Sequence, residues 1–161
     1  MDLVQTFHRE SKRLNLDYIV DKDIVIKTVT QDGEERGRIP DVSVVKGSLW
    51  NINPTSYGAI NEAPELAVEV VSTNWDDDYI DKLDEYQRLG IAEYWIVDYL
   101  AIASRDYLGN PKIATVFVYN LSEGKYKQKS FQNQDKIIST IFPELNLTVA
   151  EIIDISGIDK I

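Results

Sequence analysis

The fold is decided by residues 66–99, which read LAVEVVSTNWDDDYIDKLDEYQRLGIAEYWIVDY. Residues 66–72 are β-branched and apolar on both faces apart from Glu69, a pattern typical of a strand in the middle of a sheet. Residues 92–99 have the same character. We therefore expect two buried strands that are separated by a helix.

The residues between these strands carry the signals of a helix start and a helix end. Asn74 is placed as the N-cap, and the aspartates at 76–78 complement the positive end of the helix dipole. Gly90 follows the last apolar position and predicts the C-cap. The apolar stripe at helical spacing consists of Ile80, Leu83, Tyr86 and Leu89. Strand, helix and strand in this order predict a right-handed βαβ crossover.

Outside this unit, apolar periodicity and turn residues predict the remaining elements. They are a helix at 3–14, strands at 17–20, 23–29 and 38–45 with a turn at 33–37, an irregular loop at 47–63, a hairpin of 114–121 with 125–132, and a closing strand or helix at 145–153. The predicted class is α/β or α+β, with a mixed central sheet that is flanked by helices and followed by a C-terminal β hairpin.

Length and composition limit the classes of protein to consider. With 161 residues, of which 43% are hydrophobic and 27% charged, we expect a single globular domain over residues 1–161. No apolar run approaches the roughly 20 residues of a membrane span, and the opening residues lack the apolar core of a signal peptide. We therefore expect a cytoplasmic protein without a membrane partner. The absence of cysteine excludes disulfides, cysteine zinc sites and thiol nucleophiles.

The formal net charge of −10 opposes nonspecific binding to nucleic acid, which depends on Lys and Arg that displace counterions. The charge is unevenly distributed along the chain. Residues 76–85 contain six acids, and residues 112–136 contain five lysines. Both runs have the composition of solvated faces. The lysine run also has the composition of a basic stripe that contacts phosphates, and both interpretations stay open.

Glu69 is the exceptional residue, because an unpaired carboxylate in a buried strand is very costly. It requires a cation, a hydrogen-bond network or a metal ion, and purely structural pairing would satisfy it. Asp41 follows Pro40 at the start of another apolar strand. Two carboxylates on neighbouring strands supply the hard oxygen ligands that Mg²⁺ prefers. Lys82, early in the crossover helix, is placed to reach back to them. Two acids and a lysine are the residues of a metal-dependent phosphodiesterase site, in which the acids hold the metal and the lysine orients water or stabilises charge.

Three segments resemble the Uma2 family of restriction-endonuclease-like proteins, which belongs to the PD-(D/E)XK nuclease superfamily. They are RIPDVSVV at 38–45, PELAVEVVS at 64–72 and DKLDEYQRLGIAEYWIVDY at 81–99. The resemblance implies a restriction-endonuclease-like fold, a Mg²⁺ or Mn²⁺ cofactor and a DNA substrate. It places Asp41 and Glu69 as metal ligands and Lys82 as catalytic base or charge stabiliser. Val71 stands where the superfamily has its lysine, and the family resemblance implies that Lys82 takes the place of that lysine.

Two functions from different classes follow from these observations. The first is a metal-dependent endonuclease that cleaves DNA phosphodiester bonds, for which cleavage of both strands favours a homodimer. The second is a catalytically silent nuclease-fold module for binding or oligomerisation, which the acidic net charge favours. The single histidine, His8, is expected to be a surface or packing residue rather than a general base.

Overall fold

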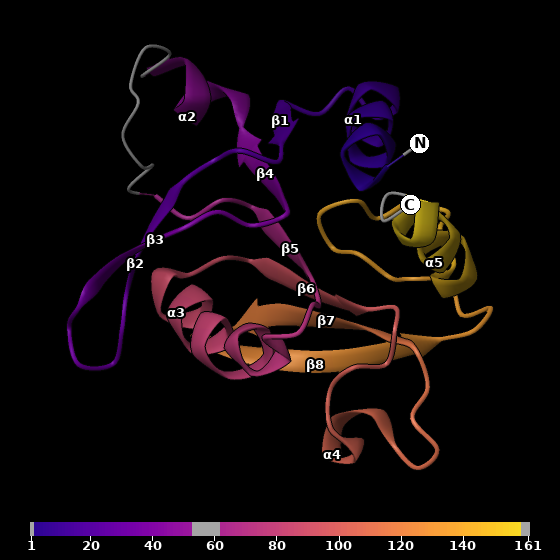
Figure 1. Ribbon diagram of the computed structural model, residues 1–161. Helices are drawn as coiled ribbons and strands as arrows, with labels where there is room; N and C mark the ends of the chain where they lie inside the picture. Colours follow the sequence, from indigo (N-terminus) through magenta and orange to yellow (C-terminus); the bar gives the residue numbers. More distant parts are fainter. Residues whose placement is uncertain (1, 53–61, 159–161) are drawn as a thin grey trace.

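The structure is a computed structural model that describes residues 2–52 and 62–158. Six strands form one sheet in the order β1-β4-β5-β6-β7-β8, and β2 pairs with β3 in a separate two-stranded sheet (Figure 1). The elements are α1 (Leu3–Arg13), β1 (Tyr18–Asp21), β2 (Ile26–Val29), β3 (Glu35–Arg38), β4 (Val42–Lys46), α2 (Gly47–Ile52), β5 (Leu66–Val70), η1 (Asp77–Asp81), α3 (Lys82–Leu89), β6 (Glu93–Asp98), α4 (Arg105–Leu108), β7 (Thr115–Ser122), β8 (Lys125–Gln132) and α5 (Val149–Ile158).

The predicted strand–helix–strand unit is confirmed. β5 and β6 are parallel neighbours, whereas all other neighbours in the six-stranded sheet are antiparallel. The connection between β5 and β6 contains η1 and α3, and Gly90 ends α3 in the left-handed conformation with φ of 94°. The sheet is therefore mixed, flanked by helices and extended by the β7–β8 hairpin, as predicted.

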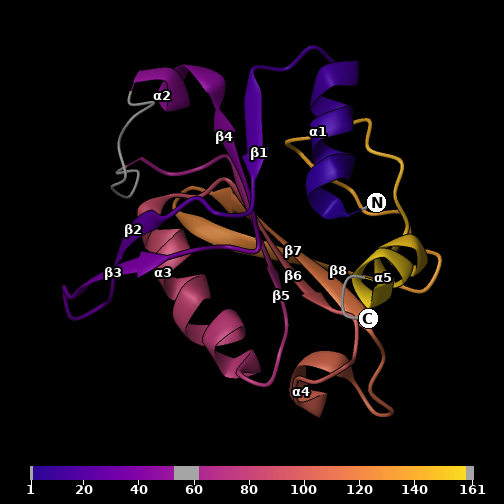
Figure 2. The same ribbon diagram turned by 45° about the horizontal axis from the view of Figure 1, so that its top comes forward.

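The sheet has helices on both faces, and the burial pattern identifies which residues point to each. In Figure 2, α3 lies on one side of the sheet and α1 and α5 lie on the other. Leu66 and Val68 of β5 belong to the core on the α1 and α5 side, while Ala67 and Val71 belong to the core on the α3 side. Because side chains alternate along a strand, Glu69 points toward α3.

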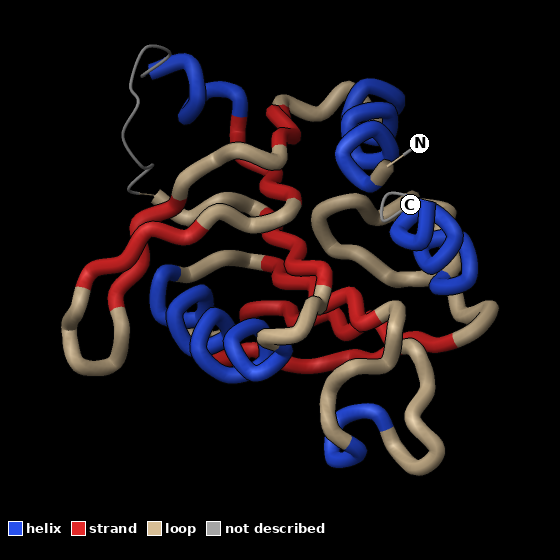
Figure 3. The backbone as a smooth tube through the Cα atoms, in the orientation of Figure 1, coloured by secondary structure: helices blue, strands red, loops and turns tan. Residues whose placement is uncertain are grey.

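The prediction was wrong between residues 33 and 45. Residues 33–37 were expected to form a turn, but residues 35–38 form β3, which pairs with β2 after a turn at residues 30–34. The expected strand 38–45 is interrupted at Pro40, and β4 begins at Val42. Proline has no N–H for a sheet ladder, so the chain leaves one sheet there and enters the other. The β2–β3 hairpin extends beside α3 (Figure 3).

The start of the crossover helix also differs from the expectation. Asp76, not Asn74, supplies the capping side chain, and the first turn is the π-helix η1. A π turn contains more residues than an α turn and therefore shifts the phase of the apolar stripe. As a result Tyr79 is buried, whereas Ile80, which was expected in the stripe, is 54% exposed.

The other predicted segments agree with the structure to different degrees. The expected loop at 47–63 begins with α2, and its residues 53–61 lie outside the described part of the chain. The closing segment contains a helix, α5, preceded by an isolated bridge between Thr148 and Lys136. The short helix α4 was not predicted. Among the described residues, no helix has the length and apolar character that crossing a membrane requires.

Candidate active site

Asp41 and Glu69 lie on neighbouring strands, as the sequence predicted. In the β4–β5 register Val42 pairs with Val68, so Asp41 stands opposite Glu69, one step beyond the paired residues. The Val70 N–H donates a hydrogen bond of 2.6 Å to Asp41 Oδ2, which anchors the Asp41 carboxylate to the end of β5. Residues directly opposite each other share a sheet face. Asp41 itself is exposed, so its carboxylate is accessible from solvent.

Glu69 is buried and has a partner on each oxygen. Its Oε1 lies 3.2 Å from Lys82 Nζ, and its Oε2 accepts a 2.7 Å hydrogen bond from the Tyr86 hydroxyl. Burial raises the pKa of Glu69 to about 7, although the Lys82 charge and the Tyr86 hydrogen bond pull that pKa down. The nearby Asp41 charge raises it further.

Lys82 connects two buried acids. Besides its contact with Glu69, Nζ lies 2.9 Å from Asp78 Oδ1 and 3.9 Å from Asp77 Oδ2. Burial alone would lower the pKa of Lys82, but the Glu69 and Asp78 charges outweigh it, and the pKa is raised. The ammonium group therefore stays protonated at neutral pH. The structure thus brings Asp41, Glu69 and Lys82 together at one place.

Sequence reasoning missed Asp78, and it placed Tyr86 in the apolar stripe of the helix while leaving a place in the site open to it. Asp78 was taken as one of three first-turn acids, yet its side chain is buried and burial raises its pKa. Its spacing of four residues from Lys82 is the one local signal of the contact. Tyr86 fills the core with its ring and donates its hydroxyl to Glu69, and burial raises its pKa, which keeps that donor protonated.

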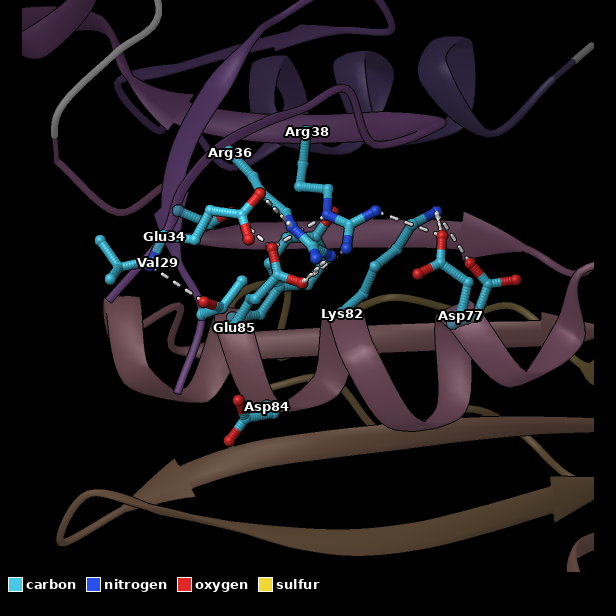
Figure 4. A network of polar contacts seen from close by, with 12 residues as sticks. Val29, Glu34, Arg36, Arg38, Asp77, Lys82, Asp84 and Glu85 are labelled. Carbon is cyan, nitrogen blue, oxygen red and sulfur yellow. Dashed lines mark hydrogen bonds and ion pairs between the residues drawn. The ribbon is translucent and has the colours of Figure 1, made fainter. Parts of the chain in front are cut away.

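A second polar network lies beside these residues and joins the β2–β3 hairpin to α3 (Figure 4). Arg38 donates from Nε and Nη2 to the two oxygens of buried Glu85 at 3.0 and 2.5 Å, and the Thr28 hydroxyl donates to Glu85 Oε1 at 2.6 Å. Burial would raise the pKa of Glu85, but these hydrogen bonds and the arginine charges lower it. Arg38 also contacts Asp77 at 3.2 Å.

Other residues that the sequence singled out lie elsewhere. His8 is exposed on α1, whose core-facing residues pack on the sheet face opposite to Glu69. Lys125, Lys127 and Lys129 are on β8, the edge strand at the far side of β6 and β7. These lysines are spaced by two residues from one another and from Phe131, so they share the sheet face of Phe131, which packs on the α1 and α5 side. These lysines therefore point away from the face that carries Glu69.

The chemistry of the donor set fits a magnesium or manganese ion. Mg²⁺ retains several waters and is commonly held by one or two carboxylates together with substrate phosphates, so Asp41 and Glu69 are the residues that would hold it. The buried Ser43 hydroxyl, two residues after Asp41, has no hydrogen-bond partner among the described residues. The described residues contain no group of three or more histidines, cysteines and acids that could hold a metal ion.

The chain matches the model of a known protein family. The family model described as "Uma2: Putative restriction endonuclease" matches residues 1–150, which is nearly the whole chain. A comparison with curated protein sequences gave no match. The matched range includes Asp41, Glu69 and Lys82 as well as the mixed sheet that positions them.

Proposed function

Because the chain belongs to the Uma2 family of putative restriction endonucleases, we propose that it is a metal-dependent endonuclease that hydrolyses DNA phosphodiester bonds. The site consists of Asp41, Glu69 and Lys82. One observation carries the proposal: buried Glu69, beside the accessible Asp41, contacts a lysine of the crossover helix at 3.2 Å. A buried acid with a strongly raised pKa next to a charge partner is typical of functional sites.

Asp41 and Glu69 would hold the Mg²⁺ or Mn²⁺ ion. When bound there, such an ion polarises the phosphate and lowers the pKa of attacking water. Asp41 is accessible, so its carboxylate is open to an incoming hydrated cation. Glu69 is held in place by the Tyr86 hydroxyl at 2.7 Å, which fixes the orientation of the carboxylate. Fixed ligand orientation improves both metal affinity and catalysis.

Lys82 is proposed to stabilise negative charge on the phosphate rather than to act as a base. Its raised pKa supports this role, since a protonated ammonium group cannot accept a proton at neutral pH. Asp78 holds the ammonium group at 2.9 Å and restricts its position. A preoriented cation next to the developing charge in a partly buried site lowers the barrier without reorganisation.

A silent binding or oligomerisation module is the second candidate function. Both oxygens of Glu69 already have protein partners, Lys82 and Tyr86, so the cluster is internally satisfied. In this case Lys82 neutralises buried acids and has no substrate. The two candidates differ in metal binding, because a satisfied structural cluster has no need of a divalent ion.

The test combines metal titration by calorimetry with a DNA cleavage assay on the same variants. We expect Asp41→Asn and Glu69→Gln to lose both metal binding and cleavage. Lys82→Ala should retain metal binding and lose cleavage by about 10²–10³-fold, because lysine is not a ligand. The exposed Lys12 supplies the control Lys12→Ala, which should cleave like the wild type at saturating DNA. A wild-type chain that binds neither Mg²⁺ nor Mn²⁺ and cuts no DNA would leave the silent module as the function.

A further inference from the structure

The β2–β3 hairpin presents two arginines to the helix that carries Lys82. Arg36 pairs with Thr28 and Arg38 pairs with Ile26 in the hairpin register, and both partners are buried against α3. The intervening residues of the hairpin point to solvent. Figure 4 shows Arg36 and Arg38 side by side above α3, both directed at Glu85.

The two arginines differ in how fully their charge is used. Arg38 is 14% exposed and makes the bidentate contact with Glu85 described above, in addition to its contact with Asp77. Arg36 is 41% exposed, and its nearest acidic oxygens are Glu85 Oε2 at 3.6 Å and Glu34 Oε1 at 4.0 Å. No hydrogen bond to the Arg36 guanidinium occurs among the described residues. Hydrogen bonds from Arg38 and Thr28 satisfy both oxygens of Glu85, and the two ion pairs of Arg36 are long, so the N–H donors of Arg36 are surplus.

This surplus cation lies beside the proposed active site. Glu85 follows Lys82 by three residues on α3, so the two side chains are neighbours on one helix face. One helical turn rises about 5.4 Å. Successive phosphates of one DNA strand are about 3.4 Å apart along the duplex axis. The two spacings are of the same order, so a strand whose reacting phosphate lies at Lys82 and that runs along α3 would bring a neighbouring phosphate toward Arg36.

We propose that Arg36 binds a backbone phosphate one or two nucleotides from the phosphate held at Asp41 and Glu69. This inference rests on the proposed endonuclease function. The guanidinium group supplies parallel N–H donors that match two phosphate oxygens, which suits a spare arginine better than a spare lysine. The β8 lysines face the other side of the sheet, so Arg36 replaces them as the expected phosphate contact on the face of Glu69.

The experiment measures binding of a fluorescent DNA duplex in Ca²⁺ buffer over a series of salt concentrations. We expect Arg36→Gln to weaken binding several-fold. The slope of log affinity against log salt is negative, and its magnitude should fall by about 0.9, which corresponds to one phosphate contact. Arg36→Lys should keep the slope, because it keeps the charge. Arg88→Gln is the matched control: Arg88 is 38% exposed, but its guanidinium group contacts Asp84 at 2.5 Å and the Val29 carbonyl at 3.2 Å.

The outcomes separate this inference from the proposed function. If the wild type binds and cleaves DNA, and Arg36→Gln has the same salt-dependence slope as the wild type, then Arg36 makes no phosphate contact. The endonuclease proposal stands in that case. If the wild type binds DNA but does not cleave it with Mg²⁺ or Mn²⁺, and only Arg36→Gln has a slope of smaller magnitude, the Arg36 contact is supported and the endonuclease proposal is contradicted. Equal slope changes in Arg36→Gln and Arg88→Gln would also overturn the specific contact, since they show a general charge effect. A wild-type chain that does not bind DNA overturns both proposals.

Discussion

At the residue scale, Glu69 shows how a single carboxylate can make stability depend on pH. Burial favours its neutral form, and the Lys82 ammonium group favours its charged form. Burial is the larger effect, so the folded chain binds the Glu69 proton more tightly than the unfolded chain does. The same direction holds for Asp78, whose pKa burial also raises. Both acids therefore favour the folded state more at low pH than at high pH.

The first prediction concerns this pH dependence in the metal-free protein. The pKa of Glu69 rises from 4.5 to about 7 on folding, so its contribution to the free energy of unfolding is complete below pH 4.5. That contribution is lost as the pH rises through about 7. The free energy of unfolding of the wild type, relative to Glu69→Gln, should fall by about 3 kcal/mol across this window. Urea unfolding of both chains at several pH values measures the difference.

A matched acid on the surface provides the control for this measurement. Asp84 pairs with Arg88 on α3, and its side chain is 46% exposed. Asp84→Asn should change the free energy of unfolding by less than about 1 kcal/mol at every pH, as exposed pairs do. Parallel stability curves for wild type and Glu69→Gln between pH 4.5 and 7 would contradict a raised pKa of Glu69.

At the scale of elements, the Arg38–Glu85 pair joins the β2–β3 hairpin to α3. Arg38 lies three residues before Asp41, and Glu85 lies three residues after Lys82. The ion pair therefore fixes the segment that enters the site from β3 relative to the helix that supplies the lysine. Thr28 on β2 donates to the same carboxylate, so both strands of the hairpin are attached to the helix.

The second prediction is the effect of breaking this attachment. Arg38→Gln leaves the buried Glu85 carboxylate without its main counter-charge, and we expect a loss of about 3–5 kcal/mol in the free energy of unfolding. The double variant Arg38→Gln with Glu85→Gln should recover part of the loss, because both charges are removed together. Arg13→Gln breaks the pair with Glu10 in α1, where Arg13 is 52% exposed, and should leave the free energy of unfolding nearly unchanged. Equal losses in Arg38→Gln and Arg13→Gln would contradict the anchoring role.

At the scale of the whole molecule, buried Glu93 ties the segment that follows β8 to the sheet. The Glu93 carboxylate accepts hydrogen bonds from Trp95 Nε1 at 2.7 Å, Ser139 Oγ at 2.6 Å, the Thr140 N–H at 2.7 Å and Asn120 Nδ2 at 3.0 Å. With a longer hydrogen bond from the Ile141 N–H at 3.4 Å, five donors satisfy this carboxylate, which otherwise would be costly in the core. The Glu93 cluster lies at the start of β6, beside Leu66. The end of β5, where Val70 contacts Asp41, lies at the opposite end of the parallel pair.

The third prediction follows from this separation. Glu93→Ala leaves several buried donors unpaired, each at about 1–3 kcal/mol, and should release the segment around residues 139–142. Hydrogen exchange measured by mass spectrometry should increase there, while protection of β4 and β5 near Asp41 stays close to that of the wild type. The exposed Glu144 in the same segment gives the control Glu144→Ala, which should leave exchange unchanged. Uniformly faster exchange across the sheet would show that Glu93 supports the global fold instead.

The sequence by itself determined the central unit and the three residues of the proposed site. Periodicity and end signals report local preference, and these identified β5, α3, its end at Gly90, β6 and the β7–β8 hairpin. A lone acid within an apolar strand, such as Glu69, indicates a buried carboxylate that needs a partner, because burial of an unpaired charge is very costly. The adjacency of the β4 and β5 strands and the contact between Lys82 and Glu69 followed from strand order and from the crossover, and the structure confirms both. Their catalytic roles stay a prediction.

Only the tertiary structure decided which other side chains complete the site. Arg38 and Glu85 are 47 residues apart, so no local pattern could pair them. The π turn at η1 changed the phase of the helix and buried Tyr79 in place of Ile80, a shift that α-helical spacing cannot predict. The direction of Arg36 depends on the break at Pro40 and on the packing of the β2–β3 hairpin against α3. Packing between residues far apart in the chain sets these contacts and side-chain directions, and the local preferences of the residues cannot predict them.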